Sequence, residues 1–340
     1  MLRSRRVGPV IAAVAGLAFT ACSETTVTKP NIGARGSAPL MDIGGEATSG
    51  TAAEELVAVM DAVNTSLEAQ GADYRVAIAE FITAAGSGEA GGTVLSKITG
   101  NKQLTGDFVP FDQRRAWSGP ASGAIDNITF AIDQSVNASG TVDAVPPTGG
   151  LTAAQTTAAI VRAMTTWEAV TCSTLGLTRV SSGPIDLGVV AAQNRLGGSG
   201  FVAADLQHAG WRDINFAGGV LGVTFTFIFG QNVGSPPVFV PSDVDNNGKA
   251  DVAFREIYYD PSWNWADDGV ADIDVESVAV HEAGHGLSQG HFGKVWLKND
   301  GTLDASPRAV MNALYAAPFR NLAGTDAAGH CSIWQTWPLE

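Results

Sequence analysis

The chain has 340 residues, enough for one good-sized domain and a smaller appendage. Hydrophobic residues make up 45% of it, so a packed core can form. The formal net charge of -14 argues against nucleic acid as a partner, because a phosphate backbone would repel the protein. The composition favours an exported acidic protein, and we expect a monomer.

Residues 1–22 have the features of an export signal. Arg3, Arg5 and Arg6 form a basic start, and the apolar run that follows is too short to span a bilayer comfortably. Two outcomes are open: cleavage after a small residue with secretion, or processing at "FTAC", which resembles a bacterial lipoprotein signal and would lipidate Cys22. Ser23 then indicates the outer membrane of the cell envelope. No other segment of the sequence is predicted to cross a bilayer.

Residues 23–50 are polar and lack periodicity, so they are predicted to be a flexible tether. Residues 51–115 are predicted to form a small helical N-terminal region, either a pro-region or a spacer. A second helical run is expected after Asp73. The first helix is indicated by apolar residues at helical spacing: Leu56, Val59, Met60, Val63 and Leu67.

Residues 116–340 are predicted to form the main domain. "DNITFAID" (residues 126–133) alternates like a strand, and residues 151–170 form a clear helix with Ile160, Met164 and Trp167 on one stripe. Further strands are expected in "LTRV", "IDLGVV", "FVAADLQ", "GVTFTFIFG" and "VAFREIYYD". Strands that follow a helix predict an α+β fold, with a twisted mixed sheet and helices packed on it.

Two cysteines remain beyond the export signal, Cys172 and Cys331. In an oxidising compartment they are expected to form a disulfide. The alternative is a pair of buried free thiols, because the sequence does not give the distance between them.

"DVDNNGKAD" has the spacing of an acidic calcium loop, with Gly248 at the tight turn. Phe254 stands where an EF-hand needs its glutamate, so a polar turn between strands is the alternative. The candidate calcium ligands are Asp243, Asp245, Asn247 and Asp251.

The next helix should begin near Asp272 or Asp274, because acidic side chains suit a helix N-terminus. It carries "HEAGHGLSQGH", which holds three of the five histidines in the chain. His281 and His285 are four residues apart, so both rings project from one helix face. Gly286 and Gly290 weaken the helix beyond that point, so the chain can fold back and deliver His291 as a third ligand.

This pattern predicts a catalytic zinc site. Three histidines leave the fourth zinc position open for water, and Glu282 can accept a proton from that water as it attacks a carbonyl. His208 and His330 are expected to be structural, since neither has recognisable partner ligands.

The segment resembles the metzincin motif H-E-x-x-H-x-x-G-x-x-H. "PRAVMNALY" resembles the Met-turn of the matrixins, with Met311 below the zinc, and "LAGTDAAGHCSIW" resembles their C-terminal helix, with Asp326 and Gly329 at its acidic and glycine positions. The resemblance covers roughly residues 117–337. It implies a matrixin-like zinc endopeptidase acting on polypeptides, with an antiparallel edge strand over the cleft. "FREIYYD" is the candidate for that strand.

The sequence departs from the family at two points. Ser288 stands where the family turns sharply at glycine, so serine is expected to adopt a less favourable backbone conformation there. The cysteine switch that keeps many matrixins latent is missing from the sequence between Cys22 and Cys172. Two other functions are open: a non-catalytic, surface-anchored zinc-binding or adhesion lipoprotein with the same fold, and a zinc hydrolase of non-peptide amides.

Overall fold

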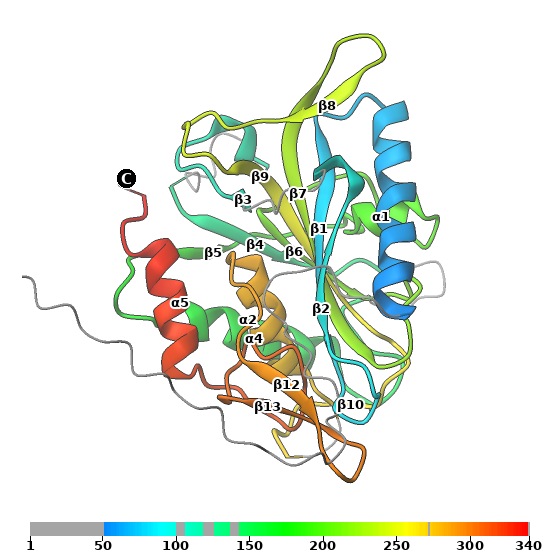
Figure 1. Cartoon of the computed structure of the whole chain (residues 1–340), viewed down its shortest axis with the longest axis vertical. Coiled ribbons are helices and arrows are strands. Elements are labelled where there is room, and N and C mark those ends of the chain that lie inside the picture. The colour runs from blue at the N-terminus through cyan, green and yellow to red at the C-terminus, as the bar shows by residue number, and fades with distance from the viewer. Residues whose placement is uncertain (1–50, 100–105, 118–125, 137–142, 271–272, 339–340) are drawn as a thin grey trace, which may run out of the picture. The chain divides into compact units, whose positions relative to one another are not determined.

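A mixed β-sheet runs through the computed structural model, which describes residues 51–99, 106–117, 126–136, 143–270 and 273–338 (Figure 1). The expected export signal, Cys22 and the tether lie outside these residues. The strand order of the sheet is β2-β1-β7-β9-β6-β4-β5, and β3 and β8 pair with β9 and β7. The strands are β1 (Tyr74–Thr83), β2 (Gly92–Leu95), β3 (Gly106–Asp107), β4 (Ile128–Ile132), β5 (Leu177–Arg179), β6 (Leu206–Trp211), β7 (Val220–Val233), β8 (Val238–Pro241) and β9 (Ala250–Tyr259).

Strand direction divides the sheet into two parts. β5, β4, β6 and β9 are parallel to one another. β7 is antiparallel to β9, β1 is antiparallel to β7, and β2 is antiparallel to β1. The mixed sheet and the α+β class expected from the sequence are therefore confirmed.

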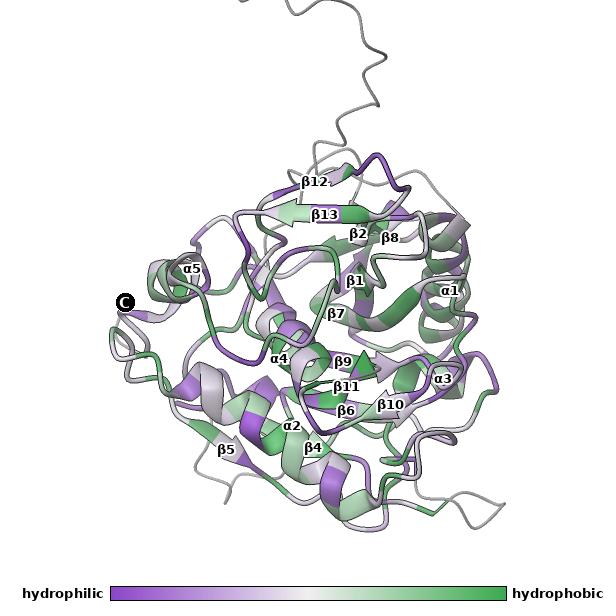
Figure 2. Ribbon diagram, turned by 90° about the horizontal axis from the view of Figure 1, so that it is seen from below, coloured by the Kyte–Doolittle hydropathy of each residue, from purple (hydrophilic) through white to green (hydrophobic). Residues whose placement is uncertain are grey.

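Helices cover both faces of the sheet (Figure 1). α2 (Ala153–Glu168) and α4 (Val275–Gly286) share one hydrophobic core with Trp334 of α5 (Gly324–Trp334). α1 (Thr51–Ala69) and α3 (Val189–Gln193) share a second core on the other face. Figure 2 shows β7 and β6 between α1 and α2. The helix predicted over residues 151–170 is confirmed, and a capping box of Thr152 and Gln155 begins it.

Shorter elements join these layers: the 3-10 helices η1 (Lys97–Thr99) and η2 (Gln113–Arg115), and two small sheets made by β10 (Trp265–Ala266) with β11 (Ile273–Asp274) and by β12 (Lys294–Leu297) with β13 (Leu303–Ser306). Among the helices that the structure describes, none has the length and hydropathy needed to cross a bilayer.

The prediction of a separate helical region over residues 51–115 is wrong. The first helix is confirmed as α1, but the second helical run is strand β1, which lies inside the main sheet. All described residues belong to one compact unit, so no domain boundary lies at residue 115. β1 is buried on both faces and paired on both edges. A strand in such a position needs a nearly continuous apolar sequence, and periodicity alone does not distinguish this sequence from that of a buried helix.

Two strand predictions also need correction. "FREIYYD" is the end of β9, which is central between β7 and β6 and is not an edge strand. "IDLGVV" contains no described strand. Its last residues begin α3 because the N–H groups of Val189 and Val190 donate to the Glu256 carboxylate at 2.7 and 3.0 Å, a contact that local sequence does not reveal.

Candidate metal centre

Helix α4 starts where the sequence predicts. Asp274 is its N-cap residue, and its carboxylate accepts hydrogen bonds from the backbone N–H of Ser277 at 2.9 Å and from the guanidinium of Arg320. All twelve residues of the helix are buried. The histidines are therefore carried by an element that the core holds on every side.

The helix ends in a Schellman turn. The N–H of Gln289 donates to the Gly284 carbonyl at 2.9 Å, and the N–H of Ser288 donates to the His285 carbonyl at 3.0 Å. Ser288 has φ of 66°, the left-handed conformation that favours glycine. The guanidinium of Arg255 donates to the Ser288 hydroxyl at 2.9 Å and to the Gly286 carbonyl at 2.7 Å. Serine therefore makes the turn at which the sequence predicts glycine to be more favourable, and Arg255 holds it.

The turn brings the third histidine back to the first two. Nε2 of His285 lies 3.0 Å from Nε2 of His281 and 3.2 Å from Nε2 of His291. Nitrogen ligands about 2.0 Å from a tetrahedral zinc ion would be about 3.3 Å apart. The predicted convergence of His281, His285 and His291 is confirmed, and its spacing fits a zinc ion.

Backbone carbonyls fix the ring orientations. Nδ1 of His281 lies 2.7 Å from the Val310 carbonyl, and Nδ1 of His285 lies 2.8 Å from the Gln289 carbonyl. A carbonyl only accepts, so each Nδ1 carries the proton and each Nε2 presents a lone pair. Burial and the neighbouring His285 hold the pKa values of His281 and His291 well below the usual range. Lone pairs that face one another in a buried space suit a bound cation.

Glu282 lies beside this cluster and is fully buried. Its Oε2 accepts a hydrogen bond from the Thr224 hydroxyl at 2.6 Å, and its Oε1 has no hydrogen-bond partner. A Cβ on Gly222 would lie 3.0 Å from Oε1, so glycine leaves room for the carboxylate. Burial raises the pKa of Glu282 to about 8, and a cation held by the histidines would lower it again.

The Met-turn expected around Met311 packs against α4. A Cβ on Gly284 would meet the Met311 sulfur at 2.3 Å, so the turn lies directly against the helix backbone. Asp326 holds the turn from α5, because its carboxylate accepts from the N–H groups of Val310 and Met311 at 2.9 and 3.1 Å. Gly329 faces the Gln289 side chain, since a Cβ at this position would lie 2.7 Å from the Gln289 side-chain oxygen.

Glu80 of β1 contacts the cluster from the opposite side. Its Oε1 lies 3.3 Å from Nδ1 of His285, and its side chain is only 13% exposed. Burial lowers the pKa of His285, but the charge and hydrogen bond of Glu80, the charge of Glu282 and the Gln289 carbonyl together outweigh burial and leave this pKa raised. The candidate metal ligands that lie close together here are the three histidines, and Glu80 is not among them.

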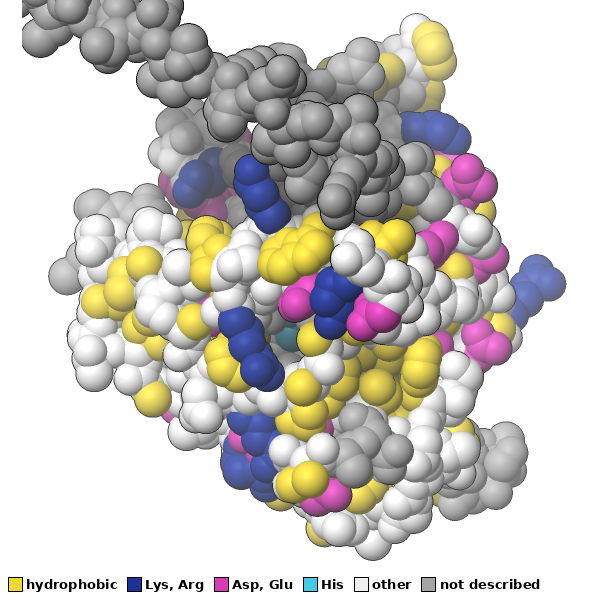
Figure 3. Space-filling model, turned by 60° about the horizontal axis from the view of Figure 1, so that its bottom comes forward, with side chains coloured by type: hydrophobic (Ala, Val, Ile, Leu, Met, Phe, Trp, Pro, Cys, Tyr) yellow, Lys and Arg dark blue, Asp and Glu magenta, His cyan; other side chains and the backbone are white. Residues whose placement is uncertain are grey.

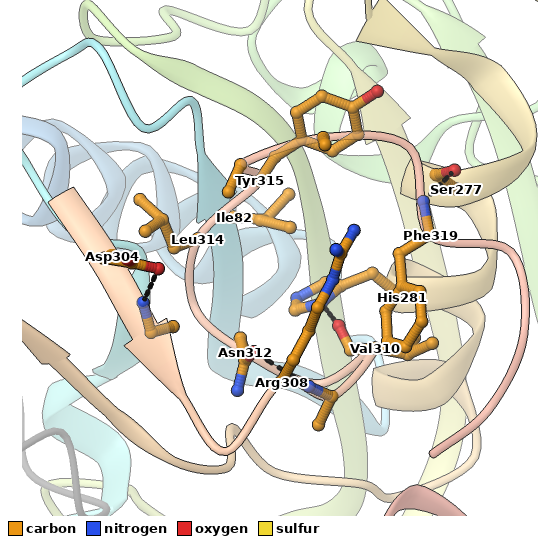
Figure 4. A pocket seen from close by; sticks show the side chains of 14 residues that line it. Ile82, Ser277, His281, Asp304, Arg308, Val310, Asn312, Leu314, Tyr315 and Phe319 are labelled. Carbon is orange, nitrogen blue, oxygen red and sulfur yellow. Dashed lines mark hydrogen bonds between the residues drawn. The ribbon is translucent and has the colours of Figure 1, made fainter. Parts of the chain in front are cut away.

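A cavity of about 270 Å³ opens beside His281. Figure 3 shows histidine surface at the bottom of a hollow on this face, between basic and acidic side chains. Ile82, Leu314 and Tyr315 line the cavity, and the Arg308 side chain extends across it (Figure 4). The Arg308 guanidinium lies 4.6 Å from the centre of the Phe319 ring. The cavity therefore combines apolar wall residues with the cationic group of Arg308.

The other predicted sites have different outcomes. Cys172 and Cys331 are bonded, with their Cα atoms 5.7 Å apart, so the disulfide is confirmed and the free thiols are excluded. His208 is buried and pairs with the Tyr259 hydroxyl, while His330 packs on Trp167, so both are structural as expected.

The calcium loop is brought together in part. Carboxylate oxygens of Asp243, Asp245 and Asp251 lie within 4.8 Å of one another. The Asn247 amide instead donates to Asp107 and Asp245, and Asp251 is paired with Arg114. Calcium binding at this loop stays a prediction.

Sequence reasoning missed Thr224, Arg255 and Glu80. Each comes from a strand that is distant in sequence from the residue it contacts; Thr224 and Glu282, for example, are 58 residues apart. No local pattern marks such contacts. No protein-family model matches this chain, and no curated protein matches it.

Proposed function

We propose that this chain is a matrixin-like zinc endopeptidase. His281, His285 and His291 hold the metal, Glu282 is the general base, and Met311 supports the site from below. The observation that carries the proposal is the convergence of three oriented Nε2 atoms beside a buried carboxylate that has one unpartnered oxygen.

The residues around the site have distinct tasks. Zinc held there would supply a Lewis acid that makes water more acidic and polarises a substrate carbonyl. Glu282 would accept a proton at Oε1 from the water whose oxygen bonds to the carbonyl carbon, while Thr224 holds Oε2 in place. The same carboxylate then delivers the proton to the leaving amine. The cavity beside His281 accepts a substrate side chain next to the cleaved bond.

A second candidate is a non-catalytic zinc protein. The observation that favours it is the burial of Glu282 and His285, both 0% exposed, which closes the centre to a large substrate in this arrangement. The Glu282 carboxylate favours the endopeptidase over this second candidate, because a protein that only holds zinc does not need a base beside the metal.

Cleavage of an unfolded protein tests the proposal. We expect a zinc-loaded protein whose site is open to substrate to cleave at least about 100-fold faster than the same protein with Glu282→Ala. A positioned base contributes about 10²–10⁴-fold to the rate. The assay should include the wild type, Glu80→Ala and Ile82→Gly, each with and without Glu282→Ala. If no zinc-loaded form exceeds its Glu282→Ala counterpart, the endopeptidase proposal fails and the non-catalytic candidate is favoured.

Export and lipid attachment at Cys22 are part of the same proposal. The mass of the mature protein, with its N-terminal residue identified, tests them: a lipid-modified Cys22 supports the anchor, and an unmodified N-terminus contradicts it.

A further inference from the structure

Strand β1 passes beside the candidate metal centre. In its pairing with β7, Glu80 is opposite Thr224 and Ile82 is opposite Gly222. Thr224 and Gly222 are the β7 residues that adjoin the Glu282 carboxylate. The part of β1 that contains Glu80 and Ile82 therefore passes the general base directly.

The end of β1 and the residues after it also form backbone hydrogen bonds on the side away from β7. The N–H of Tyr315 donates to the Thr83 carbonyl at 2.8 Å, and the N–H of Ala85 donates to the Tyr315 carbonyl at 2.9 Å. Tyr315 lines the cavity beside His281. The end of β1 and the residues after it are thus held between β7 and the segment that forms the cavity wall.

Two side chains of β1 reach the site itself. Glu80 contacts the ring of His285 at 3.3 Å, and Ile82 lines the same cavity as His281 (Figure 4). Glu282 and His285 have no solvent exposure in this arrangement. Two side chains of β1 therefore lie at a centre whose proposed general base is closed to solvent.

The position that β1 fills is one that an extended polypeptide would otherwise take. Without β1 and β2, β7 would be the edge strand, with a row of unpaired backbone N–H and C=O groups beside Glu282. Exposed sheet edges bind extended peptides by adding them as a strand. Ile82 would then mark where a substrate side chain enters the cavity.

We propose that residues 78–85 occupy the substrate-binding position along β7, so that this arrangement is a latent form of the enzyme and β1 must be displaced for activity. The inference rests on the proposed function. In this proposal β1 keeps the enzyme latent, the role that the cysteine switch has in many matrixins.

Two substitutions test this proposal by removing the two side-chain contacts between β1 and the site. Ile82→Gly removes the side chain from the cavity, and Glu80→Ala removes the contact with His285 and serves if the first variant does not fold. Glu54→Ala, the same change on the exposed face of α1, is the matched control. Zinc content is measured for every protein, so that a loss of metal is not mistaken for a loss of activity.

Two measurements are made on each protein: the rate of zinc transfer to a chromophoric chelator, and hydrogen exchange of the β1 and β7 amides. We expect hydrogen exchange to rise at least about tenfold in Ile82→Gly and Glu80→Ala, because the open population rises by the factor by which closure is weakened. Zinc transfer should rise likewise in Ile82→Gly, which leaves the contact with the ligand His285 intact. Cleavage of an unfolded protein should rise by a similar factor, while Glu54→Ala matches the wild type.

The outcomes separate the two proposals. If the wild type cleaves as fast as the variants and zinc transfer is unchanged, β1 does not block the site and the endopeptidase proposal stands. If zinc transfer and exchange accelerate but no form cleaves, the blocking role stands and the endopeptidase proposal fails. Slower cleavage by zinc-loaded, folded variants would overturn the blocking role.

Discussion

Ser288 shows how one residue shapes the metal centre. The sequence marks it as a departure from glycine, and the structure places it at φ of 66° in the turn that returns the chain toward His291. The sequence predicts this strain. It does not predict the compensation, because Arg255 reaches Ser288 from β9, 33 residues away in sequence.

Two substitutions at Ser288 separate strain from hydrogen bonding. A non-glycine residue in this conformation costs roughly 1 kcal/mol, and the bond from Arg255 contributes about 1 kcal/mol. Ser288→Gly removes both the backbone strain and the stabilising hydrogen bond. The two effects cancel, so its free energy of unfolding should match that of the wild type. Ser288→Ala keeps the strain and loses the bond, so it should be less stable by about 1 kcal/mol. Urea denaturation of the zinc-free proteins measures this; equal stability of the two variants would contradict it.

At the scale of elements, α4 and α2 are predicted well because their signals are local. A stripe of apolar residues marks α2, and an acidic start and the glycines after His285 mark the two ends of α4. β1 and α3 are predicted wrongly because their signals are not local: β1 is made a strand by pairing on both edges, and α3 is begun by the carboxylate of Glu256, 66 or 67 residues later. Local pattern therefore finds the helix that carries the proposed metal ligands and misses the strand that is proposed to cover them.

The N-cap of α4 gives a pH-dependent prediction. Burial alone would raise the pKa of Asp274, but the hydrogen bonds from Arg320 and Ser277 outweigh burial and lower it below its ordinary value of 3.8. The folded state therefore favours the ionised carboxylate. This contributes stability that is fully present above the ordinary pKa and is lost as the pH falls through the lowered one.

Asp274→Asn should therefore reduce the free energy of unfolding by about 2 kcal/mol near neutral pH, because it removes a buried, charge-assisted cap. The difference from the wild type should shrink as the pH falls below about 4. Denaturant titrations across this pH range test the prediction. A difference that stays constant down to the acid transition would show that the Asp274 charge does not contribute.

At the scale of the whole molecule, the main surprise is that residues 51–115 belong to the same fold as the candidate metal centre. The helical pattern of the sequence separates these residues from the rest, yet α1 packs on the main sheet, and β1 lies between β7 and β2. Long-range pairing of this kind has no short sequence signature. By contrast, the disulfide between Cys172 and Cys331 spans 159 residues and was predictable, because these two cysteines are the ones left after the export signal.

The zinc content of histidine variants tests the central claim most directly. The chain has five histidines, of which His281, His285 and His291 form the centre while His208 lies buried on β6. We predict one tightly bound zinc ion per chain in the wild type and in His208→Gln, and a loss of at least about 100-fold in zinc affinity in His291→Ala, which removes a direct ligand. Wild-type affinity in folded His291→Ala, or an equal loss in folded His208→Gln, would contradict the account.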